Sequence, residues 1–277
     1  MKLSVLVAVY NNAPTILRTI DSVYAQTYDA KELIIMDGGS TDGTVEILAE
    51  NSEKITYWES QADGGIYHAW NKALTRATGD WVCFLGADDF LWQPDVMARL
   101  RPELEAAFPR YRVVYGKATV VKKDGEVIKV IGTPWASAKK SFSDHLSIPH
   151  PGLLHHTSLF AEHGHFDDSF KLAGDYDLLL RELTTRDALF LPEIVTVGVQ
   201  HGGVSNTPSA MQRYLAENER VYQKHNIKRP GGWGSSRTYF NMLLASKLSL
   251  LIGDRGVRKL SDFARRLRGK PEIWNDQ

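Results

Sequence analysis

Four short apolar runs alternate with helix-like segments over the first hundred residues, and this alternation constrains the fold more than any other feature. Continuous apolar runs of strand length are typical of strands buried on both faces of a sheet. Strand–helix alternation predicts an α/β fold, with a doubly wound, mainly parallel sheet and a Rossmann-like first half. The predicted strands are Leu3–Val9, Leu33–Met36, Ile55–Trp58 and Trp81–Leu85, and the predicted helices are Pro14–Tyr24, Thr44–Glu50, Ile66–Thr78 and Pro94–Ala107.

The pattern changes after residue 110. Shorter strands are predicted at Val113–Tyr115, Ala118–Val121, Val127–Ile131 and Val195–Val199, with a hairpin turn at Lys123–Gly125 and a polar loop reaching Pro149. Helices are predicted at Tyr176–Thr185, Ser209–His225, Arg237–Ile252 and Val257–Arg268, and the candidate linker is Arg229–Trp233. We therefore expect one α/β domain over residues 1–205, divided near residue 110, and a helical C-terminal region over residues 206–277.

Composition excludes several classes of protein. No run of 18 or more apolar residues is present, so no transmembrane helix is expected, and the apolar stretch Met1–Tyr10 lacks a convincing cleavage site. The one cysteine, Cys83, excludes an internal disulfide and a CxxC zinc site, and its apolar flanks favour a small buried hydrophobe over a nucleophile. The formal net charge of zero argues against a nucleic-acid partner. We expect a reducing, cytoplasmic environment.

Polar and acidic residues follow each of the four predicted strands. Because ligands bind beyond the carboxyl ends of strands in an open parallel sheet, these segments should gather at one edge. Each segment alone could be a turn or a helix N-cap, but two adjacent carboxylates after a buried strand repel each other and favour a cation. The segments are Tyr10–Asn12, Asp37–Gly43, Asp63–Gly65 and Gly86–Asp89.

These groups suit the binding of a nucleotide diphosphate. Carboxylates prefer hard cations such as Mg²⁺ or Mn²⁺, which bridge phosphate oxygens, and glycines let the backbone approach a ligand. Neither G-x-x-x-x-G-K-[ST] nor G-x-G-x-x-G is present, which argues against P-loop NTPases and dinucleotide dehydrogenases. The phosphates would instead be held by the metal and a few side chains.

The chain resembles a family 2 glycosyltransferase, an inverting sugar transferase of GT-A fold, and is similar to the bacterial polysaccharide-assembly branch that includes colanic acid and amylovoran transferases. The resemblance covers about residues 1–205, with a nucleotide-sugar-binding half over residues 1–110 and an acceptor half over residues 111–205. The segments that carry it are Ser4–Asn11, Leu33–Gly43, Asp63–Ala73, Ala77–Asp89, His150–Gly152, Gly174–Leu178 and Gly202–Ser205.

The resemblance implies a role for several residues of the nucleotide pocket. Ala8 and Tyr10 match the strand end that contacts the nucleotide, and Asp37 matches the aspartate that reads the base. Asp63 matches the next acid of the pocket, with Asn71 and Lys72 on the adjoining helix. Lys72 would offset charge on the leaving diphosphate.

Asp88 and Asp89 match the metal motif of the family, and Asp89 is the more direct ligand in this interpretation. Gly86 departs from the pattern, because many relatives have Asn or Asp there, so coordination of Mn²⁺ or Mg²⁺ depends on the two aspartates. A late histidine completes the metal or diphosphate site in some GT-A enzymes, and His201 is the candidate here, against a structural role.

Asp175 is the expected catalytic base, because an inverting transferase needs a carboxylate to deprotonate the acceptor hydroxyl. Gly174 replaces a glutamate that relatives often carry before this aspartate. Asp177 is the alternative base, although it could instead cap the helix or pair with Arg181 four residues later. Either glycine departure, Gly86 or Gly174, would favour a non-catalytic nucleotide-sugar-binding scaffold at the membrane.

Six of the nine histidines fall between His145 and His165. A zinc cluster is conceivable, but no metal-ligand spacing such as H-E-x-x-H occurs. The resemblance places His150 near the acceptor pocket instead.

The implied function is a metal-dependent hexosyl- or N-acetylhexosaminyltransferase. It would move a sugar from a nucleotide-diphosphate donor, a UDP-sugar, to an acceptor hydroxyl on a lipid-linked glycan in surface polysaccharide synthesis. A sugar-phosphate nucleotidyltransferase fits less well, because its glycine-rich, basic N-terminal signature is absent.

The zero net charge hides a gradient along the chain. Residues 1–100 carry 14 acidic and 7 basic residues, whereas residues 237–277 carry 9 basic and 4 acidic residues. Apolar residues recur at helical spacing in this tail with Lys and Arg between them, which is typical of a basic amphipathic helix. The tail could dock on an anionic inner leaflet as a peripheral membrane segment, or form a helical cap or an oligomer contact.

Overall fold

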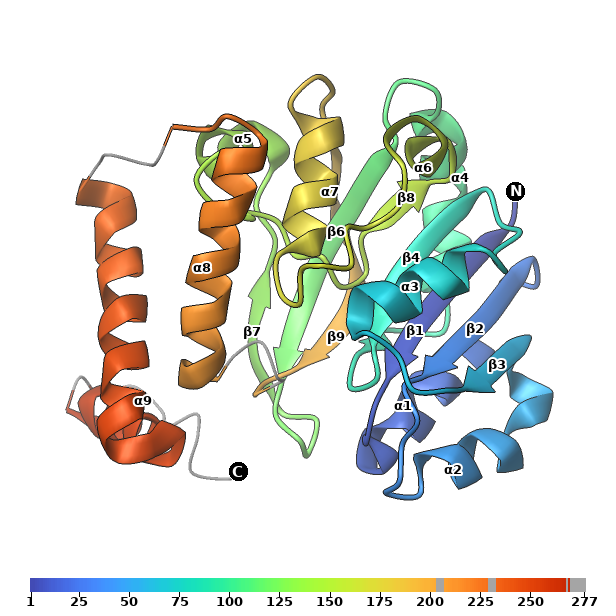
Figure 1. The fold of residues 1–277 in the computed structure, drawn as a ribbon. Coiled ribbons are helices and arrows are strands. Elements are labelled where there is room, and N and C mark those ends of the chain that lie inside the picture. Colours follow the sequence, from blue (N-terminus) through green and yellow to red (C-terminus); the bar gives the residue numbers. More distant parts are fainter. Residues whose placement is uncertain (203–206, 229–232, 268, 270–277) are drawn as a thin grey trace. The chain divides into compact units, whose positions relative to one another are not determined.

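The computed structural model describes residues 1–202, 207–228, 233–267 and 269. The chain forms two compact units, Met1–Gln200 and His201–Gln277, which are described separately (Figure 1). The first unit is an α/β structure built on one large sheet, and the second contains two long helical elements. The α/β class predicted from the strand–helix alternation is therefore confirmed.

The first half of the sheet is parallel. Its strands are β1 (Leu3–Val9), β2 (Lys31–Asp37), β3 (Tyr57–Ser60) and β4 (Trp81–Gly86), in the spatial order β3-β2-β1-β4. Val9 lies beside Asp37, Asp37 lies beside Ser60, and Ala8 lies beside Gly86. Because of this register, the carboxyl ends of all four strands reach the same edge of the sheet.

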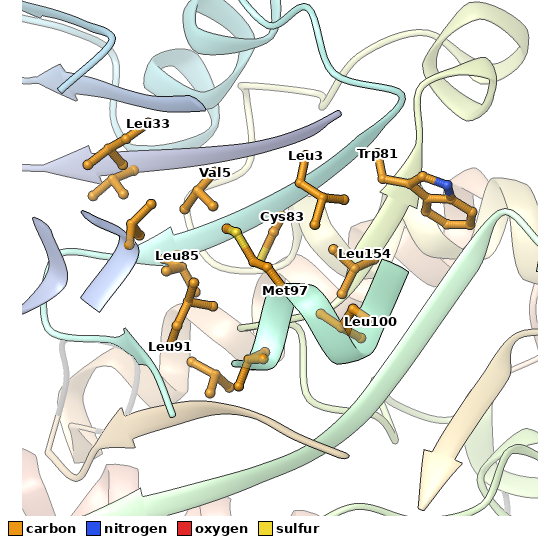
Figure 2. Close-up of a cluster of buried hydrophobic side chains, with 14 of the residues drawn as sticks. Leu3, Val5, Leu33, Trp81, Cys83, Leu85, Leu91, Met97, Leu100 and Leu154 are labelled. Atoms are coloured by element: carbon orange, nitrogen blue, oxygen red, sulfur yellow. The ribbon is translucent and has the colours of Figure 1, made fainter. Parts of the chain in front are cut away.

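Both faces of these strands are buried, which explains their continuous apolar sequences. On one face, alternate residues of β1, β2 and β4 pack against α1 (Ala13–Tyr24) and α4 (Val96–Ala107). Figure 2 shows part of this core, in which Cys83 lies with Val5 and Met97. Burial raises the pKa of the Cys83 thiol to about 12, so the prediction of a buried hydrophobe is confirmed.

The remaining helices of this half are α2 (Thr44–Glu50) and α3 (Ile66–Leu74), of which α3 packs on β1 and β2.

The second half of the sheet mixes parallel and antiparallel pairs. β6 (Val113–Val121) runs parallel to β9 (Leu189–Gln200) and antiparallel to β7 (Val127–Ile131) and β8 (Leu154–His156). β8 joins β6 to β4, and β5 (Phe90–Leu91) pairs antiparallel with β9. The full order is β3-β2-β1-β4-β8-β6-β9-β5, with β7 on β6.

Two predicted strands, Val113–Tyr115 and Ala118–Val121, are one strand in the structure. Gly116 lies between the two predicted segments and allows close approach of β9: a side chain at Gly116 would place its first carbon 2.4 Å from the carbonyl oxygen of Ile194. Here the glycine serves sheet pairing and does not end the strand.

The prediction of a polar loop up to Pro149 was wrong in one part, because this segment contains helix α5 (Trp135–Phe142). Its buried Trp135 and Phe142 rings pack edge to face at 5.3 Å, so tertiary packing stabilises a segment with little helical signal of its own. Two further helices follow, α6 (Ser158–His163) and α7 (Gly174–Leu183).

A buried ion-pair network holds α7 against the rest of the unit. Arg112, directly before β6, pairs with the fully buried Glu182 near the end of α7 and with Glu162 of α6 at 2.7 Å. The ring of His163 also contacts Glu182 at 2.8 Å. The network fixes the position of the helix whose first turn carries Asp175.

The second unit contains α8 (Pro208–Lys224) and α9 (Trp233–Arg266), which pack against each other. Gly253 interrupts α9 with φ 68° and ψ 165°, and so separates the two helices predicted on either side of it. The candidate linker lies outside the described residues except for Trp233, as does the predicted boundary at residue 205. Along the part of the chain that the structure describes, no helix is long and apolar enough to cross a membrane.

Candidate active site

The loops after β1, β2 and β3 meet at Gly38. A side chain there would place its first carbon 3.3 Å from Tyr10 Cδ2 and 3.3 Å from Asp63 Oδ2. The Tyr10 side chain is 66% exposed, so its ring is available to a planar ligand such as a base. The structure therefore brings Tyr10 and Asp63 together at the edge of the sheet, with Ala8 one residue inside β1.

Asp37 is buried at the end of β2, and its carboxylate organises two of these loops. Oδ2 accepts hydrogen bonds from the backbone N–H of Gly39 at 3.0 Å and of Ser40 at 2.9 Å, and from Ser60 Oγ at 2.6 Å. Oδ1 accepts a further bond from Ser40 Oγ. Asp37 thus joins the loop after β2 to the end of β3, a structural role that the sequence pattern did not indicate.

Lys171, which was not among the predicted site residues, lies at the same edge of the sheet. Lys171 Nζ donates to the carbonyl oxygen of Gly64 at 2.5 Å, while Asp63 Oδ1 accepts from the N–H of Gly65 at 2.7 Å. Lys171 is 107 residues from Gly64 in the sequence. No local signal links the two segments, because only the tertiary fold places the approach to α7 beside this loop.

Asn71 and Lys72, both on α3, are hydrogen-bonded to protein groups. The Asn71 side chain donates to the carbonyl oxygen of Phe166 at 2.9 Å and accepts from the N–H of the same residue at 3.0 Å. The Lys72 ammonium forms an ion pair with Glu59 of β3. These contacts fix α3 to β3 and to the segment before α7.

The two aspartates after β4 fold back over Gly86. A side chain at Gly86 would place its first carbon 2.9 Å from Asp88 Oδ1 and 3.1 Å from Asp89 Oδ2. Asp89 Oδ2 also accepts a hydrogen bond from the Gly86 N–H at 3.0 Å. The glycine that departs from the family pattern thus leaves the space in which the carboxylates converge.

Burial makes this acid pair electrostatically unfavourable. Burial raises the pKa of Asp88, and burial together with the charge of Asp88 raises the pKa of Asp89. Arg18 lies nearby: its guanidinium donates to the carbonyl oxygen of Asp88 and to Gln200 Oε1, both at 2.8 Å. A divalent cation would relieve the remaining repulsion.

The donor set fits a cation that is shared with a phosphate ligand. Two converging carboxylates provide hard oxygen ligands, and Mg²⁺ or Mn²⁺ commonly takes its other ligands from water and substrate phosphates. Within the described residues, no group of three or more His, Cys, Asp or Glu could hold a metal. His201 belongs to the second unit, and its predicted metal role stays a prediction.

Asp175 lies in the first turn of α7. Its Oδ1 atom accepts hydrogen bonds from the Tyr176 N–H at 2.8 Å and from the Tyr67 hydroxyl at 3.1 Å. Asp177, the alternative base, is fully buried and pairs with Arg181 at 3.1 Å. The predicted pairing of Asp177 with Arg181 is therefore confirmed.

His150 is buried rather than open to a ligand. Its ring packs with Trp70 at 5.3 Å and with Phe84 at 5.9 Å between ring centroids. Burial lowers the pKa of His150, and the charge of Asp175 partly opposes this shift. The ring of His150 therefore lies in a cluster of buried aromatic rings, and its predicted place near the acceptor pocket stays a prediction.

The parallel half-sheet with acidic loops at its carboxyl edge, extended by a mixed second half, defines a GT-A glycosyltransferase fold. The sequence profile of glycosyl transferase family 2 matches residues 4–157. The chain belongs to this family, as the resemblance predicted.

The curated relatives are also glycosyltransferases. An uncharacterised glycosyltransferase of Mycobacterium tuberculosis is 32% identical over 214 residues, which cover 75% of this chain and 79% of the relative. A PGL/p-HBAD biosynthesis glycosyltransferase of Mycobacterium bovis is 29% identical over 216 residues, which cover 74% of this chain and 79% of the relative.

Solved structures share the fold at low sequence identity. The mannosyltransferase PcManGT of Pyrobaculum calidifontis, in complex with GDP-Man and Mn²⁺, has a TM-score of 0.61 and 20% identity, covering 94% of this chain and 74% of that chain. TarS 1–349 of S. aureus with UDP-GlcNAc has a TM-score of 0.60 and 19% identity, covering 77% of this chain and 64% of that fragment. The match spans 38% of the longer TarS chain.

Proposed function

We propose that the protein is an inverting, metal-dependent glycosyltransferase that uses a nucleotide-diphosphate sugar, a UDP-sugar, as donor. The observation that carries the proposal is the convergence of Asp88 and Asp89 over Gly86, at the edge where Tyr10 and Asp63 also lie. Family membership supports the reaction class, and the nucleotide-sugar complexes of TarS and PcManGT support this type of donor.

The nucleoside would bind at the ends of β1 to β3. Tyr10 would offer its exposed ring to the base, Ala8 would contact the nucleotide from the end of β1, and Asp63 would accept hydrogen bonds from ribose hydroxyls or the base. Asp37 would read the base, and its four hydrogen bonds would hold the loops around the nucleoside in place. Asn71 and Lys72 would act by fixing α3.

Asp88 and Asp89 would hold Mn²⁺ or Mg²⁺, with Asp89 as the direct ligand. When bound, the cation would supply positive charge next to the departing diphosphate. The pair suits this role because burial makes its two negative charges unfavourable until a cation is present. Lys171, beside the Asp63 loop, adds a positive charge near the donor site.

Asp175 would act as the general base. Its carboxylate takes the proton of the acceptor hydroxyl while the hydroxyl oxygen attacks the anomeric carbon from the face opposite the diphosphate. A new carbon–oxygen bond forms as the bond to the diphosphate breaks, and the diphosphate leaves with the electron pair. An α-linked donor would give a β-linked hexosyl or N-acetylhexosaminyl product.

The acceptor would be a lipid-linked glycan, reached from the cytoplasmic face of the plasma membrane. Binding at the membrane surface is favoured by the exposure of large apolar side chains on α9, where Leu250 is 73% and Leu251 is 81% exposed. Arg255, Lys259 and other basic residues follow Gly253 on α9, so the element as a whole offers both apolar contact and charge complementarity to anionic lipid. A role of α9 as a cap or an oligomer contact is the alternative.

The metal role of the acid pair is tested by nucleotide binding. UDP affinity is measured by calorimetry with and without Mn²⁺ for the wild type and for Asp89→Ala. We expect Mn²⁺ to strengthen UDP binding by about tenfold or more in the wild type and to have no effect in the variant.

Asp124→Ala, in the hairpin between β6 and β7, is the control and should retain the Mn²⁺ response. Equal Mn²⁺ dependence in Asp89→Ala and in the wild type would contradict the metal assignment. A protein that binds the nucleotide but never turns over a donor would instead be the membrane scaffold.

A further inference from the structure

A tyrosine on α3 contacts the candidate base across a long sequence separation. The Tyr67 hydroxyl lies 3.1 Å from Asp175 Oδ1, although the two residues are 108 positions apart. Tyr67 is buried in the first turn of α3, and Asp175 lies in the first turn of α7. The contact therefore links the nucleotide half of the sheet to the helix that carries the base.

Packing fixes the ring of Tyr67 on several sides. The ring stacks on Phe166 at 5.4 Å with an interplanar angle of 27°, and meets Trp70 edge to face at 5.7 Å. A side chain at Gly174 would place its first carbon 2.8 Å from Cδ2 and Cε2 of the same ring. Gly174 thus allows α7 to approach the tyrosine, which gives its departure from the family pattern a physical reason.

The hydrogen bonds of Asp175 distinguish its two oxygen atoms. Oδ1 accepts from the Tyr67 hydroxyl and from the Tyr176 N–H. Among the described residues, both donors to the Asp175 carboxylate bond to Oδ1 and not to Oδ2. Two donors on one oxygen fix the rotation of the carboxylate and leave the other oxygen for an incoming hydroxyl.

Tyr67 keeps its proton under all ordinary conditions. Burial, and then the nearby charge of Asp175, raises the pKa of Tyr67 well above its usual value. The hydroxyl therefore remains a hydrogen-bond donor and does not compete with Asp175 for the acceptor proton.

We propose that Tyr67 is a positioning residue of the transfer reaction: it holds Asp175 Oδ1 so that Oδ2 receives the proton of the acceptor hydroxyl. The proposal rests on the proposed role of Asp175 as general base. Tyr67 itself contacts neither donor nor acceptor in this scheme, so its removal should slow turnover without weakening donor binding.

The test compares kcat, donor KM and nucleotide Kd for the wild type, Tyr67→Phe, Asp175→Asn and the double variant. Tyr67→Phe keeps the ring and its packing and removes only the hydroxyl. We expect kcat to fall about tenfold in Tyr67→Phe, with KM and Kd changed less than about twofold. Because Tyr67 acts through Asp175, adding Tyr67→Phe to Asp175→Asn should cause no further loss.

Tyr115→Phe is the matched control, since it also removes one buried hydroxyl, which donates to the carbonyl oxygen of Thr133 at 2.6 Å. Its kcat should be that of the wild type. The inference is overturned if Tyr67→Phe keeps the wild-type kcat while Asp175→Asn is inactive. It is also overturned if the kcat of the double variant is a further tenfold below that of Asp175→Asn, as a purely structural role would require. Full turnover by Asp175→Asn would overturn the base assignment itself, and the role of Tyr67 with it.

Discussion

His155 is a fully buried histidine in the core of the first unit. Its ring packs with Phe84 at 5.3 Å, His150 at 5.4 Å and Phe160 at 5.8 Å. Burial, and then the proximity of His150, lowers the pKa of His155 well below its usual value. The folded protein therefore holds His155 in the neutral form.

This burial makes stability depend on pH. Below the unfolded-state histidine pKa of about 6.5, the unfolded chain binds a proton that the folded chain does not, so acidification favours unfolding by about 1.4 kcal/mol per pH unit for each such histidine. In His155→Phe, we expect the loss of unfolding free energy between pH 6.5 and 5.5 to be about 1 kcal/mol smaller than in the wild type, measured by urea denaturation.

His165→Gln, at an exposed position, is the control and should keep the wild-type pH dependence. If His155→Phe loses stability on acidification as steeply as the wild type does, the neutral buried state of His155 is wrong.

At the same scale, the sequence predicted which residue types would gather at the sheet edge but not their contacts. Asp37, Asp63 and Asp88 could be predicted because each follows a strand that the local apolar sequence is enough to identify. The contact of Tyr67 with Asp175 depends on how α3 and α7 pack, and no periodicity encodes it. Gly86 and Gly174 were visible as departures, whereas the close approaches that explain them are tertiary.

At the scale of elements, strands buried on both faces were the easiest to predict. β1, β2 and β4 are continuous apolar runs because α1 and α4 cover one face of the sheet and α3 the other. β8 has only three residues, two of them histidines, and carries no such signal. α5 was missed for a similar reason, since its stability comes from the packing of Trp135 and Phe142 rather than from its polar sequence.

α9 presents apolar and basic side chains, and their role in membrane binding can be tested by substitution. Leu260 is 50% and Phe263 is 55% exposed, and they are three residues apart on the segment after Gly253. For Leu260→Ser/Phe263→Ser in the full chain, we expect binding to vesicles containing phosphatidylglycerol to weaken about fivefold or more, because apolar contact with the lipid is lost. Vesicle co-sedimentation measures this affinity.

Val130→Ser, which removes a 53% exposed apolar side chain from β7, should leave vesicle binding unchanged. Wild-type binding should also fall with salt and be absent on neutral phosphatidylcholine vesicles. Vesicle affinity that the double substitution does not alter would show that α9 is a cap or an oligomer contact.

At the scale of the whole molecule, the zero net charge is the sum of two opposite regions. The acidic first hundred residues include the carboxylates of the proposed donor site, and the basic residues are concentrated in the helical C-terminal unit. Binding of an anionic donor through a cation would require the acidic region, and binding of an anionic surface would require the basic one. Average charge excluded a strongly basic protein but carried no information about this division.

The proposed reaction requires that this family 2 glycosyltransferase turn over a nucleotide sugar with Asp175 as base. The most direct measurement is nucleoside-diphosphate release from UDP- and GDP-sugars in the presence of Mn²⁺ and candidate acceptor glycans, for the wild type and for Asp175→Asn. We expect release by the wild type, and in the variant a loss of about a hundredfold or more with nucleotide affinity changed less than about threefold. Full release by Asp175→Asn would show that Asp175 is not the base, and no release by a wild type that binds the donor would show that the protein is not a transferase for these sugars.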